Sequence, residues 1–334
     1  MTPDARGRSL ADGGGAFSDG ASSSFYNPAN LALVTKGAID FSYVNLDYSD
    51  DTIINLYVAR NTGKWGYWGV GINCLKRVFD INNFNNNDSI SNDPRQIVTG
   101  GYIRKFSLYN PALSINMAYD ISPTICIGVG AKYINTRRTD IPDDLVPGYT
   151  GQTFALDFGI GIRNIFRQST LLNSRSLSKI SNSKANYEGL SLGISMANIG
   201  PGISYDENSS KISLPKRMRL SAGYQIISMN NLGLRATLDA TTFLIDIKDY
   251  RGNKLNKTAW HYGFETSLIE LIQIRAGIYR RELYRKYFGG TLHTKHYYDN
   301  ELALGLSLGP EWFRFGFAIG DGMDYAISLS YSVR

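Results

Sequence analysis

The feature that most constrains this chain is an alternation of apolar with small or charged residues, clearest between Gly151 and Arg163. One set of alternate positions is almost wholly apolar: Gln152, Phe154, Leu156, Phe158, Ile160 and Ile162. The other set is small or charged and includes Asp157. Because successive side chains of a strand point to opposite faces, this stretch predicts a β-strand with one apolar and one polar face. The same pattern recurs through most of the chain, so we predict an all-β fold.

Bulk composition does not separate a soluble protein from a membrane β-barrel. The 334 residues are 43% hydrophobic, and no stretch approaches the roughly 18 unbroken apolar residues of a membrane helix. Barrel strands give a much weaker hydropathy signal, so they remain possible. The net charge is +6, but the strand arginines alternate with apolar residues and form no basic helix. This pattern argues against nucleic-acid binding.

The decisive question is which solvent the apolar faces meet. In a soluble β-sandwich they would pack against one another, whereas in a membrane barrel they meet lipid and the opposite faces line the lumen. The apolar faces are long enough to cross a bilayer with tilt, and several end in Tyr or Trp, as at Tyr133, Tyr224, Trp260 and Tyr325. We therefore predict a transmembrane barrel. Its lumen-facing charges would be Lys132, Asp157, Arg163, Arg217, Arg219, Arg235, Asp239, Glu265, Arg275, Glu301 and Arg314.

The links between strands predict an up-and-down topology. Short links (227–230, 269–270, 309–310) alternate with longer polar ones (199–214, 246–257, 282–297). Fifteen strand-like segments can be drawn, but single-chain bacterial barrels have an even number. We attribute the extra segment to 95–120, where a weak segment at 96–106 precedes a clear one at 112–120. The prediction is an antiparallel barrel of about 14 strands over residues 37–334.

Residues 1–36 lack the alternation of the remaining chain. They include Gly13, Gly14 and Gly15, a serine run and Asn27-Pro28-Ala29-Asn30, yet Phe17 and Leu31 make them too apolar for a free tail. We expect a compact segment lodged against or inside the barrel. Met1 leads directly into Thr2-Pro3-Asp4 without a charged and apolar leader. A membrane barrel therefore implies that a signal peptide has been removed.

Two blocks resemble a known family. Arg6 to Leu33, with Asn27-Pro28-Ala29-Asn30-Leu31-Ala32 at its end, resembles the N-terminal segment of the PorV/PorQ family and of the wider FadL-like outer-membrane proteins. Asn30 stands where those proteins usually have Gly, and because Asn tolerates a left-handed backbone we expect the turn to be retained. The stretches 194–205 and 214–224 are similar to a block of PorV/PorQ proteins.

The resemblance implies a fourteen-stranded barrel in a bacterial outer membrane, closed by an N-terminal hatch. Its motif residues would be Gly13, Gly14, Gly15, Asn27, Pro28 and Asn30. The PorV side implies a non-enzymatic role in type IX secretion, with outer-membrane lipid, the translocon and cargo proteins as partners. The alternative is a FadL-like transporter of hydrophobic small molecules such as fatty acids. That alternative predicts an apolar internal pocket and a strand kink, and a lumen filled with charge pairs would count against it.

No motif indicates an enzyme, a cofactor or a metal site. Cys74 and Cys126 fall on opposite faces of different strands, which predicts free thiols. His293 and His296 lie in a polar loop, and loop polarity explains them more simply than metal binding. His261 and Glu265 share the inner face four positions apart, and a luminal charge network explains them more simply than an acid/base pair. Residues 166–186 are basic without an acid, through Arg167, Arg175, Lys179 and Lys184, and form either a solvated loop or a site for an acidic partner.

Overall fold

The protein is a closed barrel of fourteen antiparallel strands in a computed structural model. The structure describes residues 3–46, 51–80, 105–138, 149–165, 189–204, 211–229, 231–245, 258–269, 271–286, 294–310, 312–320 and 324–333. The strands are β1 (Gly37–Leu46), β2 (Asp51–Asn61), β3 (Tyr67–Asp80), β4 (Lys105–Asp120), β5 (Ile125–Arg138), β6 (Tyr149–Ile165), β7 (Leu190–Ile199), β8 (Arg217–Met229), β9 (Leu232–Phe243), β10 (Thr258–Leu268), β11 (Ile272–Lys286), β12 (Thr294–Leu308), β13 (Phe313–Gly320) and β14 (Tyr325–Val333).

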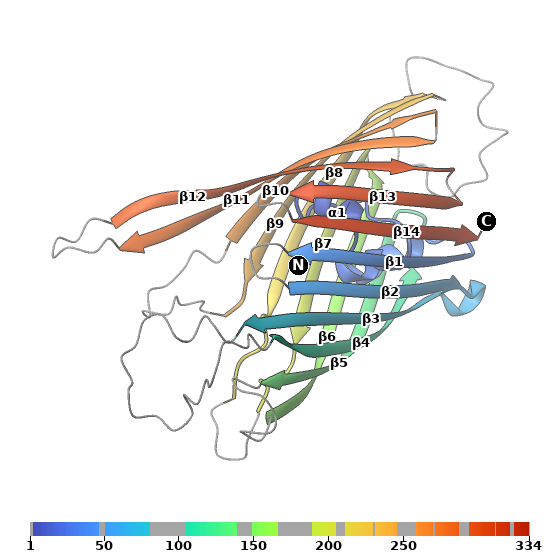
Figure 1. Cartoon of the computed structure of the whole chain (residues 1–334). Coiled ribbons are helices and arrows are strands. Elements are labelled where there is room, and N and C mark those ends of the chain that lie inside the picture. The colour runs from blue at the N-terminus through green and yellow to red at the C-terminus, as the bar shows by residue number, and fades with distance from the viewer. Residues whose placement is uncertain are drawn as a thin grey trace, which may run out of the picture.

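Each strand pairs with its neighbours in the sequence, and β14 closes the barrel against β1 (Figure 1). The closing register runs from Gly37 opposite Val333 to Asn45 opposite Tyr325. The predicted up-and-down barrel and its strand number are therefore confirmed.

The fifteenth strand-like segment was attributed to residues 95–120, and the structure has a single strand in the described part of this range. Residues 105 and 106 belong to the same strand as 112–120, because β4 continues through Pro111, where the sequence suggested a break; residues 96–104 lie outside the described part of the chain. Pro111 pairs with Cys74 of β3, while the ladder to β5 starts only at Ala112. Pro111 thus lies just beyond the end of the β4–β5 ladder, where a residue without an N–H removes no ladder hydrogen bond to β5.

The apolar side chains face outward, as the alternation predicts. In β6, Phe154 is 68% exposed and Phe158 is 43% exposed, whereas Asp157 between them is 1% exposed. The outer surface thus carries a continuous set of large apolar side chains, which in a closed barrel meets lipid. Among the described residues, no helix is long and apolar enough to span a membrane.

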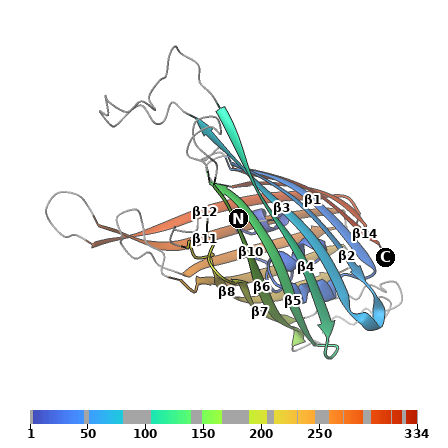
Figure 2. The same cartoon turned by 90° about the horizontal axis from the view of Figure 1, so that it is seen from below.

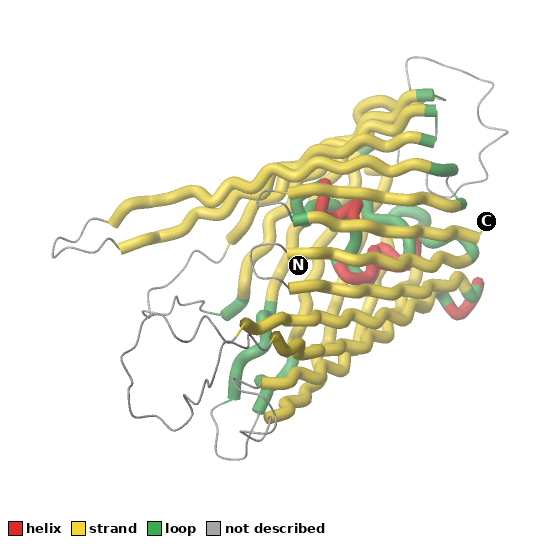
Figure 3. The backbone as a smooth tube through the Cα atoms, viewed as in Figure 1, coloured by secondary structure: helices red, strands yellow, loops and turns green. Residues whose placement is uncertain are grey.

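The N-terminal segment (residues 3–36) lies inside the barrel (Figure 3). It contains the helix α1 (Ala5–Ser9) and two 3-10 helices, η1 (Ala21–Phe25) and η2 (Pro28–Leu33); a third, η4 (Gly63–Trp65), lies in the β2–β3 turn. The α1 helix contacts β11 to β14, whereas η2 contacts β3 to β6, so the segment reaches opposite parts of the wall. Ala5, Phe17 and Leu31 are buried between it and the barrel.

The two rims of the barrel differ. One rim carries the short connections β2–β3, β4–β5, β8–β9, β10–β11 and β12–β13, the longer β6–β7 connection and the C-terminal end of β14; we call it the short-turn rim. Beyond the other rim, β11 and β12 project as a two-stranded ribbon (Figures 1 and 2). Their pairing continues to Lys286 opposite Thr294, whereas pairing to β10 stops at Arg281 and pairing to β13 stops at Ala303.

Candidate functional site

The contact surface between the N-terminal segment and the inner wall is the candidate functional site. Inner-face glycines mark its course. A Cβ on Gly223 would collide with the Phe17 ring, and one on Gly277 would collide with the backbone of Leu10 and Ala11. Further wall glycines whose Cβ would meet the segment are Gly69, Gly128, Gly159, Gly305 and Gly320. These positions lack a side chain because the segment occupies that space.

Polar wall side chains hold the backbone of the segment where it has no regular structure. Asp239, fully buried on β9, accepts the N–H groups of Gly14 and Gly15 at 2.7 and 3.1 Å. Arg219 donates to the Asp12 carbonyl at 2.7 Å, and His261 Nδ1 lies 2.6 Å from the Ala11 carbonyl. His261 therefore contacts the segment's backbone, in place of an acid/base pair with Glu265. Buried backbone groups need such partners, so these contacts fix the path of the segment.

The Asn27-Pro28 motif begins η2 and contacts the wall directly. The Asn27 side chain accepts the Ala29 N–H at 3.0 Å as an N-cap, and its amide donates to the Ile160 carbonyl of β6 at 3.0 Å. Pro28 takes the first helical position, where its missing N–H is not needed. The expectation of a left-handed turn at Asn30 is wrong, because Asn30 lies within η2 and has a negative φ. Its amide donates to the Gly15 carbonyl at 2.8 Å, which ties η2 to the glycine run.

The wall opposite this motif is irregular. The β6–β7 register shifts twice, between Leu156 and Phe158 and between Ile162 and Ile165. Each shift holds an Asn in the left-handed region, Asn198 (φ 61°) and Asn164 (φ 54°). Such β-bulges bend strands and increase their twist. Beyond Leu156, β6 is joined to the β7 side by the Gln152–Ser204 bridge and by the Thr153 hydroxyl.

The two charges first singled out in the alternating stretch sit at these bulges. Asp157 accepts the Asn198 N–H at 2.8 Å and pairs with Lys132 Nζ at 2.5 Å. Arg163 donates to the Ala29 and Ala32 carbonyls, both at 3.4 Å. The inward-facing charged residue at each bulge therefore binds a neighbouring strand or η2.

A second group of charges surrounds Glu265 of β10. Its carboxylate, 4% exposed, pairs with Arg275 at 2.6 Å, Arg6 at 3.1 Å and Arg235 at 3.2 Å. Arg6 also pairs with Asp19, so this group contains members from both the wall and the segment. Burial raises the pKa of the Asp19 carboxyl, but the charges of Arg6 and Arg235 outweigh it and hold that pKa below its usual value.

The structure places all the predicted lumen-facing charges on the inner face. Beyond those already described, Arg217 stacks on the Phe25 ring with its guanidinium carbon 4.9 Å from the centroid. Glu301 lies 3.6 Å from Arg8 of α1. Arg314 contributes to the group around Glu265 through its charge, together with Asp19, Arg6 and Arg235. The charges thus face the segment or one another.

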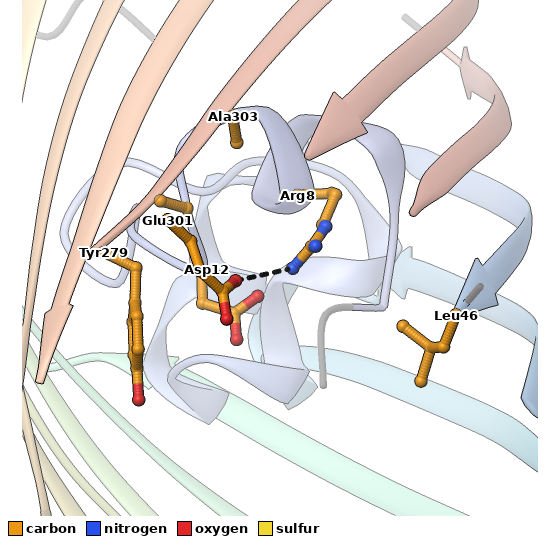
Figure 4. Close-up of a pocket in the computed structure, with 7 residues that line it drawn as sticks. Arg8, Asp12, Leu46, Tyr279, Glu301 and Ala303 are labelled. Atoms are coloured by element: carbon orange, nitrogen blue, oxygen red, sulfur yellow. Dashed lines mark ion pairs between the residues drawn. The ribbon is translucent and has the colours of Figure 1, made fainter. Parts of the chain in front are cut away.

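A cavity of about 210 Å³ lies beside α1 (Figure 4). Its lining residues are Arg8, Ala11, Asp12, Leu46, Tyr279, Glu301 and Ala303. The Arg8–Glu301 ion pair crosses it. Its wall combines the charged groups of Arg8, Asp12 and Glu301 with the apolar side chains of Leu46 and Ala303.

Sequence reasoning missed the charges of the N-terminal segment itself. Arg6 and Arg8 pair with residues hundreds of positions away, such as Asp324 with Arg8 at 2.8 Å, and Asp19 pairs with Arg6. The sequence did indicate such ion pairs, because charged residues in a segment that is otherwise buried need partners of opposite charge. The predicted partner loop with Arg167, Arg175, Lys179 and Lys184 lies outside the described residues.

Cys74 and Cys126 are free thiols, and Arg163 lies 2.7 Å from the Cys126 sulfur. Within the described ranges, no group of three or more His, Cys, Asp or Glu side chains is placed to hold a metal ion.

Comparisons with known proteins identify the fold. No family model and no curated protein matches the chain. Among solved structures, the CymD monoaromatic hydrocarbon channel aligns over 100% of this chain and 98% of its own, with a TM-score of 0.56 and 10% identity. The P. putida toluene transporter TodX gives 0.56 over 100% and 99%, also at 10% identity. A deltaS2S3 mutant of TodX gives 0.58 over 99% of each chain at 10% identity. This chain therefore has the barrel fold of these channels.

Proposed function

We propose that this protein is a FadL-like transporter of hydrophobic small molecules in a bacterial outer membrane, with residues 3–36 as its hatch. The observation that carries the proposal is the bulged β6–β7 pair, where the Asn27 amide of the segment contacts the β6 backbone. The shared fold with channels described as carrying toluene and monoaromatic hydrocarbons supports it. The short-turn rim would face the periplasm, as in other outer-membrane barrels.

The geometry suggests a sideways route through the wall. Beyond the bulge at Asp157, β6 and β7 have fewer paired residues. The exposed side chains of Phe154 and Leu156 border that region on the lipid side. A hydrophobic molecule leaving there would enter lipid without crossing the polar surface around α1. Movement of Asn27 away from the Ile160 carbonyl would free the inner side of the same strands.

A reversible cross-link across β6–β7 tests this route. Leu156 and Ile199 are paired across the ladder, and directly paired residues have the Cα separation that a disulfide accepts. In a chain with Cys74→Ser and Cys126→Ser, we expect Leu156→Cys with Ile199→Cys to abolish uptake of radiolabelled toluene and palmitate when oxidised and to restore it when reduced.

The matched control is Ile278→Cys with Leu302→Cys, a pair on β11 and β12 that is also exposed on the outer face. Its uptake should be the same in both redox states. If cells with the unmodified barrel take up neither probe faster than cells without it, the transport proposal is wrong.

A PorV-type role in type IX secretion is the second candidate, and a specific observation favours it. Within the described residues, the N-terminal segment and ion pairs occupy much of the lumen, and the cavity beside α1 has charged groups on its wall. The resemblance of 194–205 and 214–224 to the PorV/PorQ block points the same way. Co-purification of the barrel with translocon or cargo proteins would support this role. A barrel that stays monomeric in cells containing that machinery would exclude it.

A further inference from the structure

The lipid-facing apolar surface of the barrel is not equally tall on all sides. On β4, six successive outward positions are apolar and exposed or half-buried, with a tyrosine at each end: Tyr109, Pro111, Leu113, Ile115, Met117 and Tyr119. At about 3.4 Å per residue and a strand tilt of about 40°, the stretch from Tyr109 to Tyr119 covers about 26 Å of membrane thickness. This height matches the apolar band of about 25 Å that outer-membrane barrels present to lipid.

The strands β1 and β2 carry a much shorter apolar run. Three successive outward positions of each strand are apolar, and they pair across the ladder: Ile39 with Val58, Phe41 with Leu56, and Tyr43 with Ile54. By the same geometry, Ile39 and Tyr43 are about 10 Å apart across the membrane. We call these six residues the short face.

Small or polar residues border the short face at both ends. Towards the short-turn rim, the next outward positions are Gly37 and the exposed Arg60, which pair with each other. Towards the other rim, the next outward position of β1 is the half-buried Asn45. An aromatic pair marks this end, since the rings of Tyr43 and of Tyr325 on β14 lie 6.2 Å apart, and tyrosines are typical of the membrane interface. The apolar run therefore ends while both strands continue.

The height of the apolar surface changes gradually around the wall. On β3, beside β2, four outward positions within 68–74 are apolar, and on β13 four are apolar within 313–319. On β14, Tyr325 and Tyr331 are about 16 Å apart across the membrane, and Val333 follows at the C-terminal end. These strands lie side by side with β1 and β2 (Figure 1). A surface that narrows in steps on both sides fits a bilayer whose thickness changes gradually.

A bilayer of ordinary thickness does not fit the short face. The rows of Gly37 and Asn45 are about 21 Å apart across the membrane, so a band of about 25 Å would enclose at least one of these ends. Arg60 can extend its long side chain towards the headgroups, but the side chain of Asn45 is too short for this. A hydrophobic surface that is shorter than the bilayer is accommodated by thinning of the bilayer, by such extended side chains or by association. The short face continues into the lipid-facing surfaces of β3 and β14, which makes lipid the partner that it fits.

We propose that the short face holds the outer membrane locally thin, so that its partner is a bilayer with compressed acyl chains. The lowered membrane surface reaches the level of Asn45, and the next residue, Leu46, lines the cavity beside α1. The thinned zone also runs along the β1–β14 pair that closes the barrel. The inference does not depend on what the barrel transports.

Labelling of single cysteines tests the thinning directly. In a chain with Cys74→Ser and Cys126→Ser, we introduce Asn45→Cys or Arg60→Cys, reconstitute the protein in vesicles of the long-chain lipid dierucoyl phosphatidylcholine, and add a water-soluble maleimide to both sides. We expect both cysteines to react, because thinning leaves both ends of the short face in water. A bilayer of full thickness, about 30 Å or more, would shield at least one of them. Ile115→Cys, in the middle of the tall β4 surface, is the control and should stay unreactive.

Lengthening the short face should change the lipid preference of the barrel. Asn45→Leu with Arg60→Leu adds one apolar position at each end. Relative to the unmodified protein, the urea midpoint of this double variant should rise in dierucoyl vesicles and fall in short-chain dimyristoleoyl vesicles. Gln152→Leu adds an exposed apolar position beyond Phe154 on β6, where the surface is already tall, and as the matched control it should show no such exchange.

Three results would each overturn the proposal. The first is protection of Asn45→Cys or Arg60→Cys from the maleimide in dierucoyl vesicles. The second is an unchanged lipid preference of the lengthened variant. The third is an abundant disulfide-linked dimer of Phe41→Cys in vesicles, because it would show that a second copy of the chain covers the short face in place of lipid.

Discussion

At the scale of single residues, the inner wall is defined as much by missing side chains as by charged ones. Gly223 and Gly277 leave room for Phe17 and for the Leu10–Ala11 backbone, and Asp239 receives the N–H groups of the glycine run. Small residues on both partners let two backbones approach closely. The composition of the inner face therefore follows the path of the N-terminal segment.

Gly277→Val is expected to displace the N-terminal segment. Its Cβ would meet the backbone of Leu10 and Ala11, which has no rotamer to change, and overpacking of this kind costs about 1–3 kcal/mol or more. Trypsin should then cleave the folded barrel after Arg6 or Arg8, which are shielded in the unmodified protein. Gly233→Ala, whose Cβ meets the Ser267 hydroxyl, is the control and should stay resistant.

The Asp19 carboxyl should make the attachment of the segment sensitive to acid. Its pKa is lowered in the folded protein, so its contribution to stability is present above the unfolded value of about 3.9 and is lost as the pH falls through the folded value. The unfolding midpoints of the unmodified protein and of Asp19→Asn should differ at pH 7 and converge as the pH falls below the unfolded value and through the folded one. A difference that persists at low pH would contradict this role of the charge.

At the scale of secondary structure, the β6–β7 pair departs from the regular barrel. Thirteen of the strand pairings continue around the wall with one further register shift, in β8–β9, whereas β6–β7 has two. Asp157 and Arg163 occupy these two shifts and contact β5, β7 and η2. The alternation in this stretch thus hides a local irregularity that the inner charges stabilise.

Asp157→Asn should destabilise this region without affecting any chemistry. It leaves the Lys132 ammonium without its charge partner, and breaking a buried pair on one side costs about 3–5 kcal/mol. We expect the folded form to lose heat resistance on a gel, and Asp157→Asn combined with Lys132→Met to recover part of it. Unchanged heat resistance of the single variant would rule out this structural role.

At the scale of the whole molecule, the barrel and the N-terminal segment form one closed object. The segment reaches from β11–β14 through α1 to β3–β6 through η2 and so crosses the lumen (Figure 3). Barrels of more strands than about eight leave interior space that side chains of the wall do not fill. Here a separate stretch of chain fills it.

Deleting residues 2–34 should therefore open the lumen. In planar bilayers we expect the deletion variant to show stable ion conductance, whereas the complete chain should be closed or show rare openings. Gly277→Val, which displaces the segment and keeps its residues, should give intermediate conductance. A deletion variant that folds but does not conduct would show that other residues close the barrel.

The sequence by itself determined the strands and their two faces, because a period of two follows directly from strand geometry. The even strand number came from the general rule for single-chain bacterial barrels, since the pattern alone gave fifteen segments. It also identified the inner charges, since a charged residue between outward-facing apolar residues of a strand must face the lumen. It misjudged the break at Pro111 and the backbone at Asn30, because both depend on neighbouring strands or helices. Only the tertiary structure decided which charges pair. Arg6 meets Glu265 across 259 positions and Arg8 meets Asp324 across 316, and such contacts exist only once the barrel has closed around the N-terminal segment.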